Sequence, residues 1–146
     1  MRIYTESAAV GSPAYTETLP CEAASAPEAR GLAGYALHVW GVYDEAYEDV
    51  ALVVTELVAN AVRHAATAPT IRVRVQHVRP GAVYVAVIDR STALPVRVAA
   101  GNEGERGRGL ALVHAVASAW GCDPMPWGKR VWAEVPYAAP PAGRVP

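Results

Sequence analysis

The spacing of apolar residues predicts two consecutive helices in the first half of the chain. Apolar positions recur with a helical period over residues 28–40 and again over residues 45–65. The tetrapeptide SAPE at 25–28 has the Ser-x-x-Glu form of a capping box, and Gly41 is the residue expected to end the first helix. Asp44 is the expected cap of the second helix.

Strand patterns occur on both sides of these helices. Apolar residues alternate with arginine and glutamine in one segment and form a more uniform run in the next, and Pro80-Gly81 between the two suits a tight turn. The strand-like segments are residues 1–7, 14–20, 70–78, 82–89 and 130–136.

A third helix is expected over residues 110–120, ended by Gly121 and followed by a turn over residues 123–129. It follows a long glycine-rich segment, residues 90–108, and loops of that length in compact domains are usually functional or mobile. Two adjacent strands that can form a hairpin, with helices before and after them, predict an α+β fold. We expect a two-layer sandwich, in which an antiparallel or mixed sheet carries helices on one face.

Composition restricts the classes of protein to consider. The chain has 146 residues, of which 52% are hydrophobic and 18% charged, and its net charge is -1. We expect one folded domain over residues 1–137, with residues 1–18 as an N-terminal strand or extension and residues 138–146 as a disordered tail. Near-neutral charge argues against a nucleic-acid binder. Cys21 and Cys122 lack the spacing of a zinc site or disulfide scaffold.

No apolar run reaches the length of a membrane span, and the N-terminal residues lack the hydrophobic region of a signal peptide. These two features predict a soluble cytoplasmic protein without a membrane partner.

The second helix carries one narrow polar stripe, formed by Glu56, Asn60 and the pair Arg63-His64. One interpretation is the solvent face of an amphipathic helix. The other is a site for a hard cation, because Mg²⁺ prefers oxygen ligands and usually shares its shell with water and phosphates. In that case the carboxylate could act as a general base.

Two further features admit both a structural and a functional interpretation. Glycines at positions 101, 104, 107 and 109 lead into a helix N-terminus, which favours phosphate binding but also suits a flexible surface loop. The pattern fits neither a Rossmann fingerprint nor a Walker P-loop. Asp89 ends an apolar strand, where it could bond the following turn or accept a hydrogen bond from the exocyclic amine of a purine.

The order of these features resembles the GHKL ATP-binding superfamily. The segments ELVANAVRHA, VIDRSTALP, GERGRGLALVHAVASAWG and GKRVWAEVP are similar to the anti-sigma-factor serine/threonine kinase branch, in particular its short actinobacterial members. The resemblance covers about residues 19–137 and implies ATP bound between the loops at one end of the sheet and the long helix.

This resemblance implies roles for single residues. Asn60 would hold Mg²⁺ against the phosphates, Glu56 would be the catalytic base, and Asp89 would accept the adenine amine. The residues that would line the phosphate lid are Gly104, Gly107, Gly109 and Leu110. The implied substrate is an anti-sigma-factor antagonist of the STAS type, and a sigma factor is a further implied partner. Members of the branch often pair through the N-terminal portion, so a homodimer is expected by analogy.

The sequence departs from the branch at two places. Asp89-Arg90-Ser91 replaces Asp-x-Gly-x-Gly, which removes glycines beside the base, and Lys129-Arg130 replaces a Gly-Thr or Lys-Thr pair, which deletes a hydroxyl. Two alternatives to the kinase therefore stay open: a non-catalytic module that sequesters a partner, and a detached histidine-kinase catalytic domain. Arg63 and His64 match the branch without an assigned role.

Overall fold

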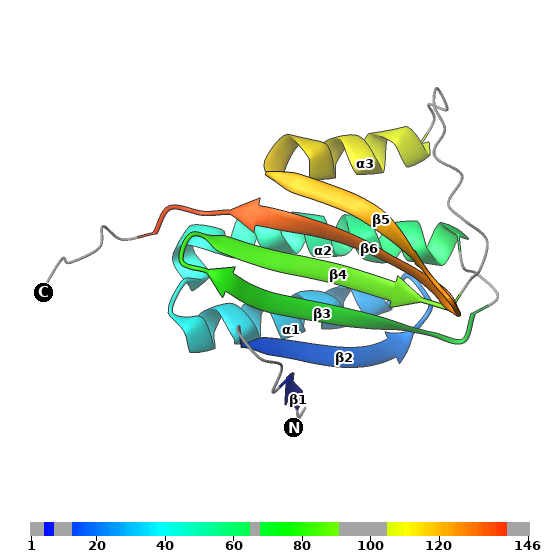
Figure 1. Cartoon of the computed structure of the whole chain (residues 1–146), viewed down its shortest axis with the longest axis horizontal. Coiled ribbons are helices and arrows are strands. Elements are labelled where there is room, and N and C mark those ends of the chain that lie inside the picture. Colours follow the sequence, from blue (N-terminus) through cyan, green and yellow to red (C-terminus); the bar gives the residue numbers. More distant parts are fainter. Residues whose placement is uncertain (1–4, 8–12, 65–67, 91–104, 140–146) are drawn as a thin grey trace, which may run out of the picture.

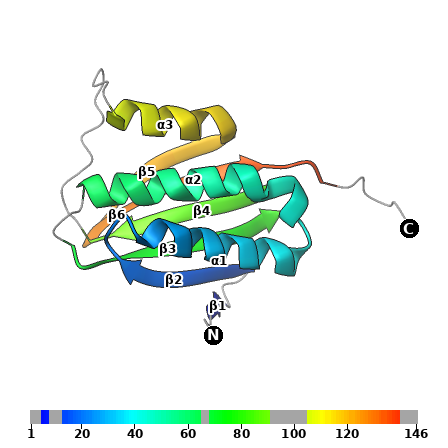
Figure 2. The same ribbon diagram turned by 180° about the vertical axis from the view of Figure 1, so that it is seen from behind.

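A six-stranded sheet and a layer of helices on one of its faces make up the computed structural model (Figures 1 and 2). The structure describes residues 5–7, 13–64, 68–90 and 105–139. Every pairing between neighbouring strands in this part of the chain is antiparallel. The expected two-layer α+β sandwich is therefore confirmed, with an antiparallel rather than a mixed sheet.

The strands follow the order β1-β2-β3-β4-β6-β5 across the sheet, so the last strand in sequence lies between β4 and β5. The strands are β1 (Thr5–Ser7), β2 (Ala14–Pro20), β3 (Thr70–Arg79), β4 (Ala82–Asp89), β5 (Ala119–Met125) and β6 (Gly128–Pro136). The helices are α1 (Ser25–Trp40), α2 (Tyr43–His64) and α3 (Glu105–Val116). Figure 2 shows α2 in the middle of the helical layer, with α1 and α3 on either side of it.

The expected starts of the first two helices are wrong in detail. Ser25 is the first residue of α1 and makes no capping bond; its buried hydroxyl donates to the carbonyl oxygen of Pro20 at 2.6 Å. Asp44 lies inside the first turn of α2 instead of before it, where a carboxylate still favours the positive end of the helix dipole. Gly41 ends α1 as expected, with a left-handed φ of 74°.

The segment after α3 is a strand that the sequence pattern did not predict. α3 ends at Val116, and Ala119–Met125 forms β5, which pairs along its length with β6. Gly121 therefore does not end a helix. It lies opposite Trp132, and a Cβ at this position would come within 3.2 Å of the indole ring, so the glycine makes room for the tryptophan.

Valines form most of the interface between the two layers. Alternate residues of β3, β4 and β6 point toward the helices, and all are at most 5% exposed. These residues are Val73, Val75, Val83, Val85, Val87, Val131, Ala133 and Val135. They pack against the buried faces of α1 and α2 in one continuous core. Burial of one such valine contributes roughly 1.5–3 kcal/mol, so this interface holds α2 firmly over β4.

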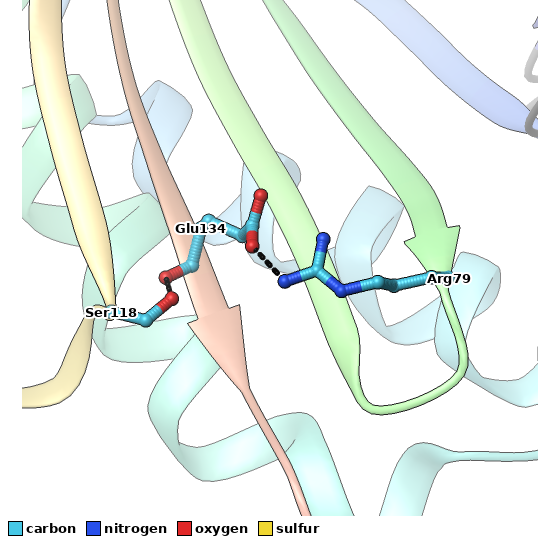
Figure 3. Close-up of polar contacts among 3 residues, drawn as sticks. All are labelled: Arg79, Ser118 and Glu134. Carbon is cyan, nitrogen blue, oxygen red and sulfur yellow. Dashed lines mark hydrogen bonds and ion pairs between the residues drawn. The ribbon is translucent and has the colours of Figure 1, made fainter.

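Polar contacts bridge strands on the opposite, open face. Arg79 at the end of β3 reaches across β4 and forms an ion pair with Glu134 of β6, and the Ser118 hydroxyl donates to the Glu134 carbonyl oxygen at 3.2 Å (Figure 3). Arg130 pairs with Asp123 of β5 at 2.7 Å on the same face. None of the helices in the described part of the chain has the length and hydropathy needed to span a bilayer.

Candidate functional site

The polar stripe of α2 is only partly exposed to solvent. Asn60 is 4% exposed, Glu56 and His64 are half-buried, and Arg63 is exposed. Thr55 accepts a hydrogen bond from Arg30 of α1, and with about 100° per residue Asn60 lies on a flank turned away from Thr55. An asparagine buried on a helix flank does not suit a plain solvent face, so the solvent-face interpretation fails for Asn60.

Asp89 and Lys129 form a buried ion pair at the end of β4. They are cross-strand partners on β4 and β6, and the Lys129 Nζ donates to the Asp89 Oδ1 at 3.0 Å. Their side chains are 0% and 1% exposed. Because a buried charge is stable only when paired, each side chain fixes the position of the other. In the sequence, Lys129 stands out only as a departure from the family pattern, and nothing in its spacing from Asp89 indicates that the two residues pair.

The tip of the β5–β6 hairpin holds the pair in place. Met125 and Gly128 are register partners, with a two-residue turn between them. Gly128 packs against the end of β4 so closely that a Cβ would lie 2.0 Å from the carbonyl oxygen of Asp89. In the turn, Trp127 lies beneath the Arg90 guanidinium, which is 5.5 Å from the ring centroid. Arg90 directly follows Asp89, so the hairpin contacts both residues.

The charges of the same pair influence the pKa values of two cysteine thiols, Cys21 and Cys122. Burial raises the pKa of the Cys21 thiol, the Asp89 carboxylate raises it further, and the Lys129 ammonium lowers it. Burial also raises the pKa of Cys122, where Lys129 again acts in the opposite direction. Neither of these cysteines forms a disulfide; Cys122 lies on β5, next to β6, and Cys21 directly follows the end of β2.

Three of the four expected lid residues lie within α3. Gly104 lies outside the described residues, as does the segment 91–103. Gly107, Gly109 and Leu110 lie within α3, which begins at Glu105, five residues earlier than expected. The glycines therefore belong to the first turns of a helix instead of the loop before it. Figure 1 shows the start of α3 at the same end of the molecule as the end of β4 and the end of α2.

The donor set suits Mg²⁺ only in the company of phosphates. In the described part of the chain, no group of three or more histidine, cysteine, aspartate or glutamate side chains could hold a metal ion. Asn60 and Glu56 supply oxygen atoms on one flank of α2, and Mg²⁺ commonly binds through one or two protein oxygens plus water and substrate phosphates. The residues therefore fit Mg²⁺ brought by a nucleotide, and do not fit a metal site made by protein alone.

A separate cavity of about 190 Å³ opens on the other face of the sheet. Its lining residues are Thr18, Thr70, Ile71, Arg72, Ile88, Arg90 and Trp127. Thr18, Arg72 and Ile88 are register partners across β2, β3 and β4, and alternation along β4 places Ile88 on the face opposite Asp89. This cavity is therefore distinct from the space beside α2 that the nucleotide would require.

The comparison with known families agrees with the fold and with the expected superfamily. Residues 19–133 match the family model of the histidine kinase-like ATPase domain. No curated protein matches the sequence. The matched span contains α2, the end of β4 and the start of β6, which carry Asn60, Asp89 and Lys129 respectively. ATP binding is the common property of such domains, and the chain belongs to the histidine kinase-like ATPase family.

Proposed function

We propose that the chain is an ATP-dependent protein serine/threonine kinase of the anti-sigma-factor type. The observation that carries the proposal is the burial of Asn60 on the flank of α2, one turn from the half-buried carboxylate of Glu56. An amide and a carboxylate at this spacing provide one oxygen for a metal and one base for a hydroxyl. The end of β4, with Asp89, would bind the base of the nucleotide.

The proposed reaction transfers the γ-phosphoryl group of ATP to a serine or threonine hydroxyl. The hydroxyl oxygen attacks the γ-phosphorus, the bond to the β,γ-bridging oxygen breaks, and ADP leaves with that electron pair. Glu56 accepts the hydroxyl proton on a carboxylate oxygen. Mg²⁺, held by Asn60 and the phosphates, would neutralise charge that develops on the transferred group. Positioning and electrostatics supply most of the rate enhancement in such transfers.

The proposed protein substrate is an anti-sigma-factor antagonist of the STAS type, and a sigma factor is the second proposed partner. Phosphorylation of the antagonist would regulate transcription by changing which partner the kinase holds. A cytoplasmic location and a homodimer belong to the same proposal. Support for all of these comes from the resemblance of the segments around Glu56, Asp89 and Gly109 to that branch.

The test separates ATP binding from transfer. Glu56→Gln should retain ATP binding and lower the rate of phosphate transfer to a STAS-type antagonist by about 100-fold or more, because a positioned base contributes about 10²–10⁴-fold. Glu48→Gln, an exposed glutamate of the same helix, is the matched control and should transfer normally. Normal transfer by Glu56→Gln would refute the assignment of the base.

The Asp89–Lys129 ion pair favours a second candidate function, a non-catalytic module that sequesters a partner. Here the pair would serve only to join β4 to β6. This candidate requires that sigma-factor binding persist in Asn60→Ala and Asp89→Asn variants and be unaffected by ATP. Isothermal titration with and without ATP decides between the two, since the kinase binds Mg-ATP saturably and the module does not require it.

A further inference from the structure

The cavity of about 190 Å³ on the open face of the sheet brings together polar side chains from three adjacent strands. Thr18, Arg72 and Ile88 are register partners on β2, β3 and β4. Thr70 stands two residues before Arg72 on β3, on the same face of the sheet. Arg90 comes two residues after Ile88, just past the end of β4, and also lines the cavity. Figure 1 shows this end of the sheet, where the tip of the β5–β6 hairpin also lies.

The two arginines make this cavity positively charged. Its lining contains no aspartate or glutamate, and neither Arg72 nor Arg90 forms an ion pair or hydrogen bond through its guanidinium with any other described residue. Arg130 on the same face differs from them, because Asp123 offsets its charge at 2.7 Å. The carboxylate of Asp89 lies on the opposite face and is buried. The cavity therefore has the charge that complements an anion with two negative charges.

Trp127 restricts the position of the Arg90 guanidinium. The indole ring lies beneath the guanidinium, with its centroid 5.5 Å from the Arg90 Cζ. This cation–π contact uses no N–H group in a hydrogen bond, so the donors of Arg90 stay available to a ligand. Gly128 fixes the hairpin turn that carries the tryptophan, through its close approach to the Asp89 carbonyl. A cation that is already held in place loses less conformational freedom on binding.

The donor set favours a phosphate monoester over a carboxylate. A phosphate monoester offers three terminal oxygens and about two negative charges, and a carboxylate offers two oxygens and one charge. The planar guanidinium groups of Arg72 and Arg90 match phosphate oxygens, and the hydroxyls of Thr18 and Thr70 can add neutral hydrogen bonds.

The size of the cavity restricts the ligand further. Its volume is about 190 Å³, below the roughly 300–1,000 Å³ of pockets that enclose a drug-sized molecule. A phosphoryl group with the first atoms of its ester suits this space, and a whole nucleotide does not.

We propose that this cavity is a phosphate-binding site, in which Arg72 and Arg90 hold a phosphate monoester between them. A phosphorylated serine side chain and a free small phosphate present the same group, and the experiment separates these two sources. The inference goes beyond the proposed kinase, because the cavity lies on the other face of the sheet and contains neither Glu56 nor Asn60.

The experiment is an NMR titration of the isotope-labelled full-length protein, without nucleotide, at constant ionic strength and about pH 7.5, where both probes are mainly dianions. The probes are inorganic phosphate and a short peptide with one phosphoserine, and the unphosphorylated peptide is the reference. The amide signals of Thr18 and Arg72 and the indole N–H signal of Trp127, identified with Trp127→Phe, should shift saturably. The amide signal of Asn60 should stay in place.

Variants at the two arginines test the ligand contacts. Arg72→Met and Arg90→Met should each weaken binding about tenfold, the effect of one hydrogen bond to a charged group. Both residues are exposed, so their replacement leaves the core intact, and unchanged amide signals far from the cavity verify this. Arg74→Met is the matched control, because Arg74 is the next residue of β3 on the same face and does not line the cavity. It should bind within about twofold of wild type, since salt screens its charge.

Each outcome supports or overturns the site. Saturable binding of only the phosphopeptide, or of only inorganic phosphate, supports it and identifies the source of the phosphate. The absence of saturable shifts with both probes overturns it, as does equal binding of the unphosphorylated peptide.

Two further results would also overturn the inference. If Arg74→Met weakens binding as much as Arg72→Met, the general positive charge of this face explains the effect. If the shifts centre on Asn60 instead of Trp127, phosphate binds at the proposed nucleotide site. Because no nucleotide is present, failure here leaves the proposed kinase untouched, and loss of kinase activity leaves this site untouched.

Discussion

Gly128 and Asp89 approach each other so closely that no side chain fits between their strands: a Cβ on Gly128 would lie 2.0 Å from the Asp89 carbonyl oxygen. The obstructing atom belongs to the backbone of β4 and cannot rotate away. Gly128→Ala should therefore destabilise the protein by about 3 kcal/mol or more, a large effect with a named steric cause.

The matched control is Gly34→Ala in α1. A Cβ there would meet the rings of Tyr43 and Tyr47 at 3.6 Å, which is ordinary contact, and alanine is the better helix former. This variant should stabilise the protein by about 0.5–1 kcal/mol. Urea unfolding of both variants measures the difference, and equal stability of Gly128→Ala and wild type would contradict the close approach.

The buried ion pair and the surface ion pair should differ strongly in their effect on stability. Lys129→Met leaves the Asp89 carboxylate buried without its cation and should cost about 3–5 kcal/mol. Arg79→Ala removes a pair whose arginine side chain is 60% exposed and should cost about 0–1 kcal/mol. Chemical denaturation at neutral pH provides both values.

Replacing both members of the buried pair tests the reason for that cost. Asp89→Asn/Lys129→Met has no uncompensated charge, so it should lie closer to wild type than Lys129→Met does. If the double variant is instead less stable than the single one, the loss comes from the packing of the residues and not from their charge.

The thiol of Cys21 should report the charge state of the pair. Its pKa lies above the ordinary value of 9.0 because of burial and of the Asp89 carboxylate. In a Cys122→Ser background, Asp89→Asn should lower the midpoint of the pH profile of alkylation by iodoacetamide, and Lys129→Met should raise it. Shifts in the same direction for both variants would show that the two charges do not act on this thiol.

His77 should make the fold less stable at acid pH. Burial lowers its pKa below the ordinary value of 6.5, and its Nε2 lies 2.7 Å from the Tyr137 hydroxyl. Below about pH 6.5 the unfolded chain then binds more protons than the folded chain. The free energy of unfolding therefore keeps its full value above that pH and decreases as the pH falls through the lowered pKa. Urea unfolding at pH 7.5 and pH 5 measures the loss, which should be smaller in His77→Gln.

The sequence pattern predicted the fold where local signals and burial agree. The bounds of β2 and β4 match the strand-like segments of the sequence, and the turn at Gly81 and the end of α1 at Gly41 each have a glycine at a positive φ. β5 was missed because Ala119–Met125 contains a glycine and a proline and has no alternation; the strand exists because β6 offers it an edge. For such a segment, pairing with a neighbouring strand determines the secondary structure, and the local sequence pattern does not.

The candidate site was accessible to sequence reasoning only one element at a time. Helical spacing grouped Glu56 with Asn60, and the end of an apolar strand marked Asp89. No periodic pattern could associate Asp89 with Lys129, because their contact depends on β6 lying between β4 and β5. The Ser25 capping box failed for a similar reason, since its hydroxyl finds the Pro20 carbonyl through the path of the chain before α1.

The position of β6 within the sheet also sets the order of events during synthesis. Lys129 follows Asp89 by 40 residues, and β5 has no partner among the described strands except β6. While the ribosome adds those residues, β4 presents an open edge and its terminal carboxylate has no cation from β6. Because β6 joins β4 to β5, the described part of the sheet beyond β4 can form only once β6 is available to pair with both strands.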